Sequence, residues 1–265
     1  MTISDRQLER YARNIILDEV GEDGQEKLLA SKVLVVGAGG LGAPVLLYLA
    51  AAGVGTLGIV DDDTVDLTNL QRQIVHASDR LGQPKVESAA ATLNNLNPDV
   101  RLVRHNLRLD AESVDALLAG YHLVVDGSDN FKTRYLLNDA CYFARIPLVS
   151  AALLRFDGQV STFKAYLEGD NPCYRCLFPS LPPADLIPRC EEAGILGAIA
   201  GVIGSLQATE VLKELLGLGE SLSGRLLIYD GLSTTFRKIK INRDEGCALC
   251  GTNPTIERPI PHRSA

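Results

Sequence analysis

The chain has 265 residues, a formal net charge of −7, 46% hydrophobic residues and 22% charged residues. This length suits one large domain, or one domain with appendages, that buries a sizeable core, and the negative charge argues against a nucleic-acid or membrane-surface binder. Met1–Glu9 is polar, and no apolar run reaches the roughly 18 residues of a membrane span. Six cysteines without a secretion signal favour a reducing compartment, so we expect a cytoplasmic protein.

The first predicted element is a polar helix over Asp5–Leu17, which carries Arg10 and Arg13. Arginines on a surface helix are most often solvated. Contact with a phosphate is the alternative, and the helix alone does not support it. A short second helix over Gly24–Leu29 is expected to lead into the first strand.

The segment Lys32–Asp63 carries the clearest functional pattern. It predicts a buried strand over Lys32–Val36, an apolar helix over Ala43–Ala52 and a second strand over Thr56–Val60. The glycines between the first strand and the helix fit G-x-G-x-x-G, with one glycine in addition: Gly37, Gly39, Gly40 and Gly42. Asp61 ends the second strand, about 20 residues after the turn.

These residue types are those of a nucleotide site. Glycines permit a tight turn and a close approach of the backbone to phosphate. The N-terminus of the helix offers free N–H groups and the positive end of its dipole. An acidic residue at the end of the second strand can accept hydrogen bonds from ribose hydroxyls. An ordinary tight turn is the alternative, and the motif does not distinguish NAD, FAD and ATP.

A polar loop follows the acid cluster Asp61–Asp63 and leads to a helix that begins at Pro84, where the missing N–H costs nothing. Lys85 then lies in the first turn, where the helix dipole disfavours a cation unless an anion compensates. A phosphate would be such an anion, so Arg72 and Lys85 are candidate phosphate ligands. Two solvated cations are the alternative.

Three more strands are predicted, over Val100–Arg104, His122–Asp126 and Ile146–Ser150, and two helices over Asp110–Leu118 and Phe131–Phe143. Their short connections favour a doubly wound parallel sheet, whose ligands lie beyond the carboxyl ends of the strands. Asp126, Ser128 and Asp129 lie at such an end, so Asp129 is a candidate Mg²⁺ ligand beside a nucleotide. Capping of the next helix by Asp126 or Asp129 is the alternative.

The pattern changes at about Ala151. The remaining elements are antiparallel strands and one long helix: strands over Gly158–Phe163, Arg225–Asp230 and Thr234–Ile241, and a helix over Gly194–Leu216. Leu177–Pro188 is too rich in proline for a regular element. We therefore expect an α/β fold with a Rossmann-like, doubly wound, mainly parallel sheet that antiparallel strands extend. Thr252–Ala265, with three prolines, is expected to be a disordered tail.

Two Cys-x-x-Cys pairs, Cys173/Cys176 and Cys247/Cys250, predict one tetrahedral four-thiolate metal site. Zn²⁺ in a structural role is expected, because no ligand position remains for water. Two redox dithiols or a rubredoxin-like iron site are the alternatives.

The other two cysteines differ in their surroundings. Cys141 lies in an apolar helix and is expected to be a small buried hydrophobe. Cys190 lies in the proline-rich segment beside Arg189, where an accessible thiolate next to a cation is favoured for reactivity. An ordinary exposed thiol is the alternative for Cys190.

The order of these motifs resembles the HesA/MoeB/ThiF family of the ubiquitin-activating-enzyme superfamily. The motifs are RYARNIIL, GAGGLGAP, VDDDTVDLTNLQRQ, GQPKVES, DGSDNFKTR, PCYRC, GVIGSLQATE and CALCG. The resemblance covers the chain from about residue 5 to residue 251. It implies a single adenylating domain over residues 1–251, with a nucleotide-binding half over about 30–150 and a carrier-binding and zinc half over about 151–251.

The family resemblance also implies a reaction. Its members bind Mg·ATP and the C-terminal Gly-Gly tail of a small ubiquitin-like sulfur carrier of the MoaD or ThiS type. The tail carboxylate attacks the α-phosphate, which gives an acyl-adenylate and pyrophosphate. A separate sulfur donor then provides the sulfur for a thiocarboxylate. Molybdopterin synthesis, thiamin synthesis and tRNA thiolation all stay open as the pathway.

Matched motif by motif, the resemblance assigns roles to the candidates above. Nucleotide binding is assigned to Gly37, Gly39, Gly40, Asp61, Asp63, Asn69, Arg72, Lys85, Ser128, Asp129 and Asn130. A part in catalysis is assigned to Arg13, Arg72, Lys85, Asp129 and Cys190. Asp61 would hold the ribose and Asp129 the Mg²⁺. Arg13 would reach the ATP site of the other subunit in a homodimer, and Cys190 falls where the family keeps the cysteine of its crossover loop.

Charge supports this reading, because two anions, a carboxylate and a triphosphate, need fixed cations and a metal to react. The glycine motif also permits an NAD-dependent oxidoreductase. That alternative leaves the cations and Asp129 unexplained and lacks an evident hydride-transfer base. A non-catalytic carrier-binding relative is the other alternative, against which the presence of Arg72, Lys85 and Asp129 argues.

Overall fold

One eight-stranded sheet forms the centre of the molecule. The structure, a computed structural model, describes residues 3–181 and 194–259. The strands are β1 (Lys32–Val36), β2 (Thr56–Val60), β3 (Arg101–His105), β4 (Leu123–Asp126), β5 (Leu148–Leu154), β6 (Asp157–Phe163), β7 (Arg225–Asp230) and β8 (Thr235–Lys240). Their order is β3-β2-β1-β4-β5-β6-β7-β8; the first five are parallel and the last three pair antiparallel. The predicted fold class is confirmed.

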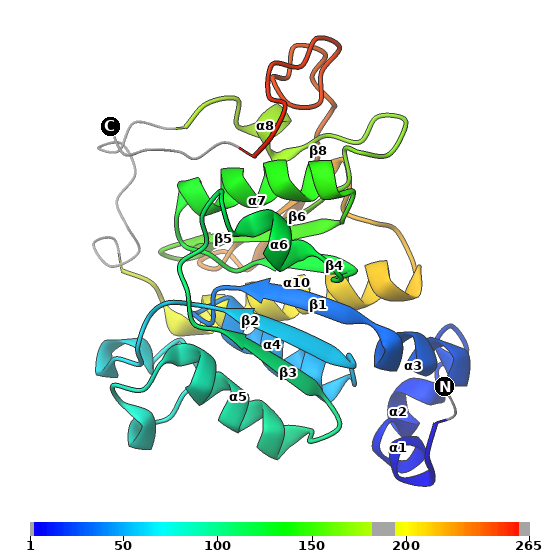
Figure 1. Cartoon of the computed structure of the whole chain (residues 1–265), viewed down its shortest axis with the longest axis vertical. Coiled ribbons are helices and arrows are strands. Elements are labelled where there is room, and N and C mark those ends of the chain that lie inside the picture. The colour runs from blue at the N-terminus through cyan, green and yellow to red at the C-terminus, as the bar shows by residue number, and fades with distance from the viewer. Residues whose placement is uncertain (1–2, 182–193, 260–265) are drawn as a thin grey trace.

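Helices cover both faces of the sheet (Figure 1). One face carries α3 (Gly21–Ala30), α4 (Gly42–Ala51), α5 (Lys85–Leu96) and α10 (Gly197–Leu216), and the other carries α6 (Val114–Leu118), α7 (Phe131–Ala144) and α8 (Tyr174–Leu177). Val33 and Val35 of β1 pack into the first core, while Leu34 and Val36 pack into the second. The unbroken apolar run in β1 follows from this burial on both sides.

The direction of winding reverses between β1 and β4. The chain leaves β1 through α4 to reach β2 on one side, and leaves β4 through α7 to reach β5 on the other. The carboxyl ends of β1 and β4 therefore open onto the topological switch point of the sheet, where doubly wound folds bind their ligands.

Two predicted helices differ from the observed ones. The helix expected over Asp5–Leu17 is two helices, α1 (Asp5–Arg10) and α2 (Ala12–Ile15), which Tyr11 separates. The Tyr11 hydroxyl accepts a hydrogen bond from Asn97 Nδ2 at 2.8 Å, so this residue points into the body of the protein. The helix expected from Asp110 begins only at Val114, because the Asp110 carboxylate accepts bonds from the following backbone N–H groups.

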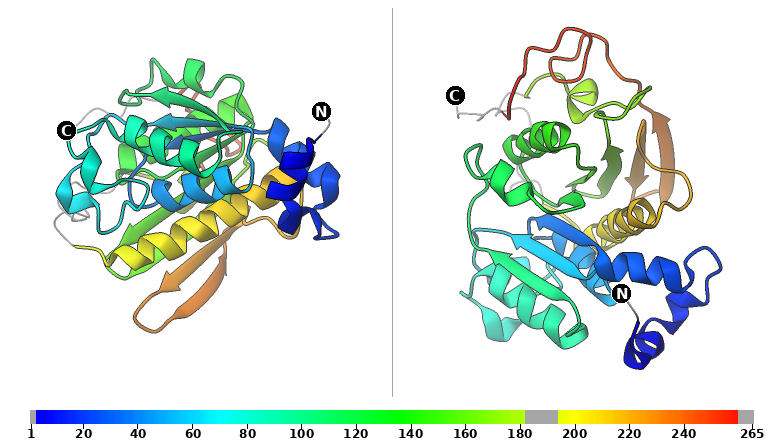
Figure 2. Two further views of the ribbon diagram at one scale, coloured as in Figure 1. Left: turned by 90° about the horizontal axis from the view of Figure 1, so that it is seen from below. Right: turned by 45° about the vertical axis from the view of Figure 1, so that its right-hand side comes forward.

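The β7–β8 hairpin extends from the body of the molecule (Figure 2). β8 is the edge strand of the sheet, and its side chains are exposed. Arg237, Lys238 and Lys240 lie on it, and charged side chains of this kind discourage pairing with another strand. None of the helices within residues 3–181 and 194–259 combines the length and apolar character needed to cross a membrane.

Ordered structure continues beyond residue 251, where the sequence predicts the start of a disordered tail. The backbone N–H groups of Thr255 and Ile256 both donate to Ala248 O, at 2.8 and 3.0 Å. Ile256 is buried against the cysteine cluster described below. Pro259 is buried as well, so residues 252–259 make contacts with the rest of the protein, while residues 260–265 lie outside the described part and the disordered tail stays a prediction.

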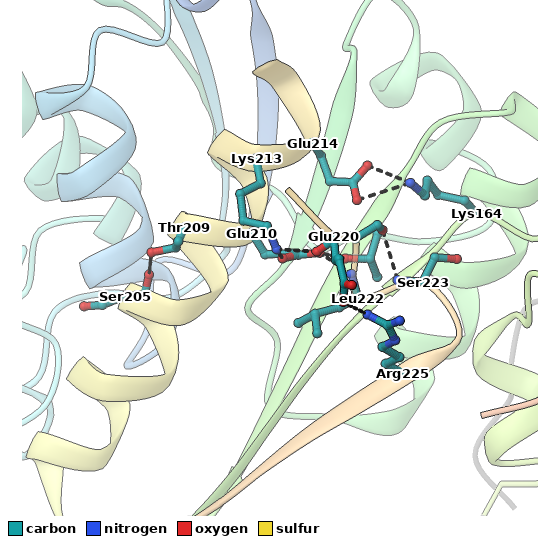
Figure 3. A network of polar contacts seen from close by, with 12 residues as sticks. Lys164, Ser205, Thr209, Glu210, Lys213, Glu214, Glu220, Leu222, Ser223 and Arg225 are labelled. Carbon is teal, nitrogen blue, oxygen red and sulfur yellow. Dashed lines mark hydrogen bonds and ion pairs between the residues drawn. The ribbon is translucent and has the colours of Figure 1, made fainter. Parts of the chain in front are cut away.

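A buried carboxylate joins α10 to the strands beside it (Figure 3). Glu210 is 3% exposed and accepts hydrogen bonds from Leu222 N–H and, at 3.1 Å, from Thr162 Oγ1. Lys213 Nζ donates to its other oxygen. One turn further along α10, Glu214 pairs with Lys164 at 2.9 Å. These bonds fix the C-terminal end of α10 to β6 and to the segment before β7.

We expect Glu210→Ala to lower the free energy of unfolding by about 3 kcal/mol, because two buried donors and one ammonium lose their partner. Urea unfolding measures the change. Glu220→Ala is the matched control, since this carboxylate is exposed and pairs with Arg225 at the surface. Equal midpoints for the two variants would contradict the role given to Glu210.

Candidate functional site: the end of the sheet at β1 and β4

The glycine turn after β1 is pressed against the loop after β4. Gly37 has a φ of +96°, and a Cβ at this position would lie 2.8 Å from Gly127 O. A Cβ on Gly42 would lie 1.8 Å from Gly37 O. Only glycine fits at these two positions, so the sequence motif has a direct steric cause.

The peptide groups of this turn are held from two sides. Asp61 Oδ2 accepts a hydrogen bond from Ala38 N–H at 2.7 Å, and the ring of His76 bonds Ala38 O at 2.9 Å. The N–H groups of Gly39 and Gly40 make no hydrogen bond within the described residues. These amides precede the N-terminus of α4, so the turn offers an anion two free donors and the positive end of a helix.

Asp61 lies where the sequence predicts, at the end of β2. Its second oxygen, Oδ1, accepts from Asp63 N–H at 2.9 Å, so both oxygens are oriented by backbone donors. Burial raises the pKa of Asp61, and the nearby charge of Lys85 opposes that rise. Each oxygen keeps acceptor capacity that a ribose hydroxyl can use.

Lys85 is a buried cation. Its residue is 6% exposed, and Nζ lies 2.9 Å from Asp63 Oδ2, the only ion pair of Lys85 among the described residues. The Lys85 N–H donates to Asp63 O at 2.9 Å, which places the start of α5 against the acid cluster. The structure thus brings Lys85, Asp61 and Asp63 together, as the predicted site requires.

Asn69 and Arg72 lie on the loop between β2 and α5. Asn69 ends the short 3-10 helix η1 (Leu67–Asn69), where its Oδ1 accepts from Asp66 N–H at 3.2 Å. Arg72 reaches the glycine turn: its Cγ and Cδ would lie 3.7 Å from a Cβ on Gly40. Its Nη1 donates to Thr68 O at 3.1 Å, and the other guanidinium nitrogens make no hydrogen bond within residues 3–181 and 194–259, so an anion can use them.

In the loop after β4, some polar residues stabilise the local structure and others are candidates for the site. Asp126 is fully buried and accepts from Ser128 Oγ at 2.6 Å and Ser150 Oγ at 2.7 Å. Asn130, not Asp126 or Asp129, caps α7, since its Oδ1 accepts from Thr133 N–H at 2.9 Å. The capping alternative for the two aspartates is wrong. Asp129 is exposed, and its only partner in the described part is Asn130 Nδ2 at 3.5 Å.

Sequence reasoning missed three buried residues that hold this end of the sheet in place. Arg134 donates from Nη2 to Ser128 O at 2.7 Å and from Nη1 to Ala151 O at 2.9 Å. Gln207 of α10 donates to Asp126 O at 2.8 Å and to Val149 O at 3.0 Å. His76 is the third. A polar residue on the buried side of an apolar helix is an available signal for Gln207. Arg134 and His76 each bond a backbone carbonyl, and no sequence pattern reveals such a partner.

The four cysteines of the two Cys-x-x-Cys pairs form one cluster, as predicted. Their sulfurs lie within 4.8 Å of one another, with separations of 3.6 Å for Cys173–Cys247 and 3.4 Å for Cys176–Cys250. Zn–S bonds of about 2.3 Å at a tetrahedral centre give sulfur separations of about 3.8 Å, so the thiols fit zinc. Hydrogen bonds among the thiols lower the pKa values of Cys176 and Cys247 and raise those of Cys173 and Cys250.

The four-cysteine cluster is fixed to α7. Arg175, between the first two cysteines, makes a buried two-pronged pair with Asp139, with both N–O distances at 2.7 Å. Asn138 Oδ1 accepts from Tyr174 N–H at 2.7 Å. Figure 1 shows α8 beside the C-terminal segment and next to α7. Helix α7 therefore contacts the four-cysteine cluster and, at its N-terminus, the loop with Asp129.

Two predicted residues, Arg13 and Cys141, remain apart from this site. Arg13 is exposed on α2, whose Asn14 bonds Gln25 of α3 at 3.2 Å; Gln25 in turn bonds Ala52 O at 2.9 Å, beyond the C-terminus of α4. The glycine turn precedes the other end of α4, about 15 Å along this helix. Cys190 lies outside the described residues. Cys141 is buried, and burial raises its pKa well above the ordinary value, as expected for an inert thiol.

Comparison with known proteins places the chain among adenylating enzymes. The model of the ThiF family matches residues 11–249. The SAMP-activating enzyme E1 of Haloferax volcanii is 52% identical over 251 residues, which cover 95% of this chain and 92% of that protein. The sulfur carrier protein adenylyltransferase of Thermus thermophilus is 49% identical over 260 residues, or 97% and 96% of the two chains.

Two further comparisons bear on length and on fold. The adenylyltransferase and sulfurtransferase MOCS3 of Aedes aegypti is 47% identical over 261 residues, which are 98% of this chain but 59% of that protein. Among solved structures, E. coli MccB with ATP gives a TM-score of 0.77 at 21% identity and covers 94% of this chain and 75% of that one. At this identity the likeness concerns the fold.

Proposed function

This chain belongs to the ThiF family, and we propose that it is an ATP-dependent adenylyltransferase that acts on a small ubiquitin-like sulfur carrier. It joins the C-terminal Gly-Gly carboxylate of the carrier to AMP and releases pyrophosphate, ahead of thiocarboxylate formation. The names of relatives that match over nearly their whole length support this function. The carrier is of the MoaD or ThiS type, and the pathway stays open.

The observation that carries the proposal is the set of charges around the switch point. Lys85, Arg72 and the free amides of the glycine turn lie on the β1 side of the switch point, and Asp129 lies on the β4 side. An attacking carboxylate and a triphosphate repel each other, so their reaction needs fixed positive charge at the α-phosphate. Lys85 is suited to this task, because burial prevents water from screening its charge.

Asp129 is the residue that we propose for Mg²⁺. Its carboxylate is exposed beside the switch point and has only one long hydrogen bond within the described residues, so it is available to a cation that prefers carboxylate and phosphate oxygens. When bound, the metal would neutralise charge on the triphosphate. The residues Asp61, Asp63, Asn69, Ser128 and Asn130 orient the nucleotide from the two loops in this proposal, with Asp61 on the ribose.

The remaining roles extend beyond this site. We propose Zn²⁺ for the four-cysteine cluster, in a structural role. In a homodimer, Arg13 of one subunit would reach the ATP site of the other. The sulfur comes from a separate donor protein, and Cys190 takes part in the transfer that follows adenylation. The free thiols Cys141, Cys173, Cys176, Cys247 and Cys250 are consistent with a cytoplasmic enzyme.

Exchange of label between pyrophosphate and ATP tests the proposed function. We expect exchange only when a carrier with an intact Gly-Gly tail is present, and a mass increase of the carrier that corresponds to AMP. A carrier without the final glycine is the control. No exchange with any Gly-Gly-tailed carrier, or binding of NAD in preference to ATP, would reject the assignment.

A further inference from the structure

His76 is a buried histidine that contacts the glycine turn, and nothing above assigns it a function. It lies in the loop between β2 and α5 and is 8% exposed. One ring nitrogen, Nε2, lies 2.9 Å from Ala38 O, and the other, Nδ1, lies 2.9 Å from Ser88 Oγ. The ring therefore connects the turn after β1 with α5.

These two partners determine which ring nitrogen of His76 carries the hydrogen. A carbonyl oxygen only accepts, so Nε2 carries the hydrogen and donates it to Ala38 O. Nδ1 of the neutral ring then accepts from the Ser88 hydroxyl. Burial lowers the pKa of His76, and the bond to Ala38 O opposes this in part. The nearby charges of Lys85 on α5 and Arg80 on the loop add to the lowering. The neutral ring with hydrogen on Nε2 is thus the form that fits its surroundings.

The bond to Ala38 O sets the direction of the next amide. In a planar trans peptide the C=O and the N–H point in opposite directions. When His76 holds Ala38 O on the protein side, the Gly39 N–H must point away from the ring. Asp61 fixes the preceding peptide through Ala38 N–H at 2.7 Å. Without His76, flexible glycines on either side would let Ala38 O rotate toward a bound phosphate and repel it.

The bond to Ser88 sets the position of the turn relative to Lys85. Ser88 is one helical turn beyond Lys85 on α5, so the ring fixes how far the free amides lie from the buried ammonium. Arg80 supports the same turn of α5, with Nη1 bonds to Ser88 O and, at 2.6 Å, to Thr92 Oγ1.

We propose that His76 is a positioning residue for phosphate binding: it keeps Ala38 O turned inward and the Gly39 N–H turned outward, in register with Lys85. The proposal rests on the proposed function only for the identity of the anion, the phosphates of ATP. His76 does not contact the nucleotide in this account. Its effect should therefore depend on the phosphates of the ligand and not on its base.

The test compares binding of Mg·ATP and of adenosine to the full chain by calorimetry, with adenosine measured by displacement. We expect His76→Leu to weaken ATP binding about tenfold, since an inward carbonyl loses its donor, while adenosine binding stays unchanged. His76→Gln should bind ATP within about threefold of wild type, because its amide N–H can replace the Nε2 donor. His105→Gln is the control, as this half-buried histidine bonds Tyr121 and not the turn.

The outcomes test the role of His76 separately from the proposed function. Equal losses for ATP and adenosine, or no loss for ATP, would overturn the role of His76. A wild-type protein that does not bind Mg·ATP would instead overturn the proposed function. If His76→Leu does not fold by thermal melting, Ser88→Ala replaces it, since this change removes only the hydroxyl that orients the ring. We then expect about a threefold loss for ATP alone, and an unchanged affinity would reject the proposal.

Discussion

Replacing Lys85 with alanine is expected to lower carrier-dependent ATP–pyrophosphate exchange at least about 100-fold. The Lys85 ammonium is buried and lies among the acid cluster and the glycine turn, so neither water nor another described lysine can take its place. In a site of this kind the fixed charge acts mainly on the transition state, where negative charge gathers at the α-phosphate. The loss should therefore appear chiefly in kcat.

Arg104→Ala is the matched control for Lys85→Ala. Arg104 faces α5 from β3 and pairs with Glu87 at 2.8 Å, but both members of this ion pair are about half exposed. Such a pair contributes little to stability, and Arg104 is not part of the proposed site. We expect an exchange rate close to that of wild type for the control. A Lys85→Ala variant that retains more than about a tenth of wild-type exchange would remove Lys85 from the catalytic group.

Replacing Cys250 with serine is expected to remove the zinc proposed for the four-cysteine cluster and to lower the melting temperature by about 10 °C. Structural zinc sites contribute folding free energy directly, and each kcal/mol shifts the melting temperature by about 2–4 °C in a chain of this size. The four-cysteine cluster joins α8 to the C-terminal segment, and around it only a small core of residues such as Ala165, Leu249 and Ile256 is packed. Besides this core, Arg243 donates hydrogen bonds to Cys250 O and Ala165 O, so few contacts among the described residues would replace the metal.

Cys141→Ala is the control for the loss of a thiol, because Cys141 is buried in α7 and is not part of the four-cysteine cluster. Its metal content should equal that of wild type. Elemental analysis of the purified protein, together with melting curves, measures both variants. One metal ion per chain in the Cys250→Ser variant would contradict the four-thiolate site, and iron in place of zinc would revise the metal.

The fold followed from the sequence where pattern and chemistry are local. The valine run of β1, the glycine spacing and Asp61 at the end of β2 each depend on neighbours within about 30 residues, and the structure has each of them as predicted. The four-cysteine cluster joins distant segments, but paired cysteines indicate a shared metal wherever they lie. These parts could be predicted because the residue types alone indicate the physical constraint.

The parts that could not be predicted depend on partners that the sequence does not name. His76 and Arg134 bond backbone carbonyls, which every residue has, so no residue type marks their partners. Asn130, and not Asp126 or Asp129, caps α7. The cap depends on the residue at which the helix begins, which the sequence does not determine to within one residue. Ile256 and Pro259 are buried in residues 252–259, a stretch whose composition is otherwise typical of a tail.

The single sheet has a consequence for motion. β5 belongs to the parallel half and pairs along its whole length with β6, the first antiparallel strand. Hinge closure, in which two lobes swing together over a substrate, would require these ladder bonds to break. The two halves must therefore move as one body, and any rearrangement that admits ATP or the carrier tail has to come from the connecting loops and not from a change of angle between lobes.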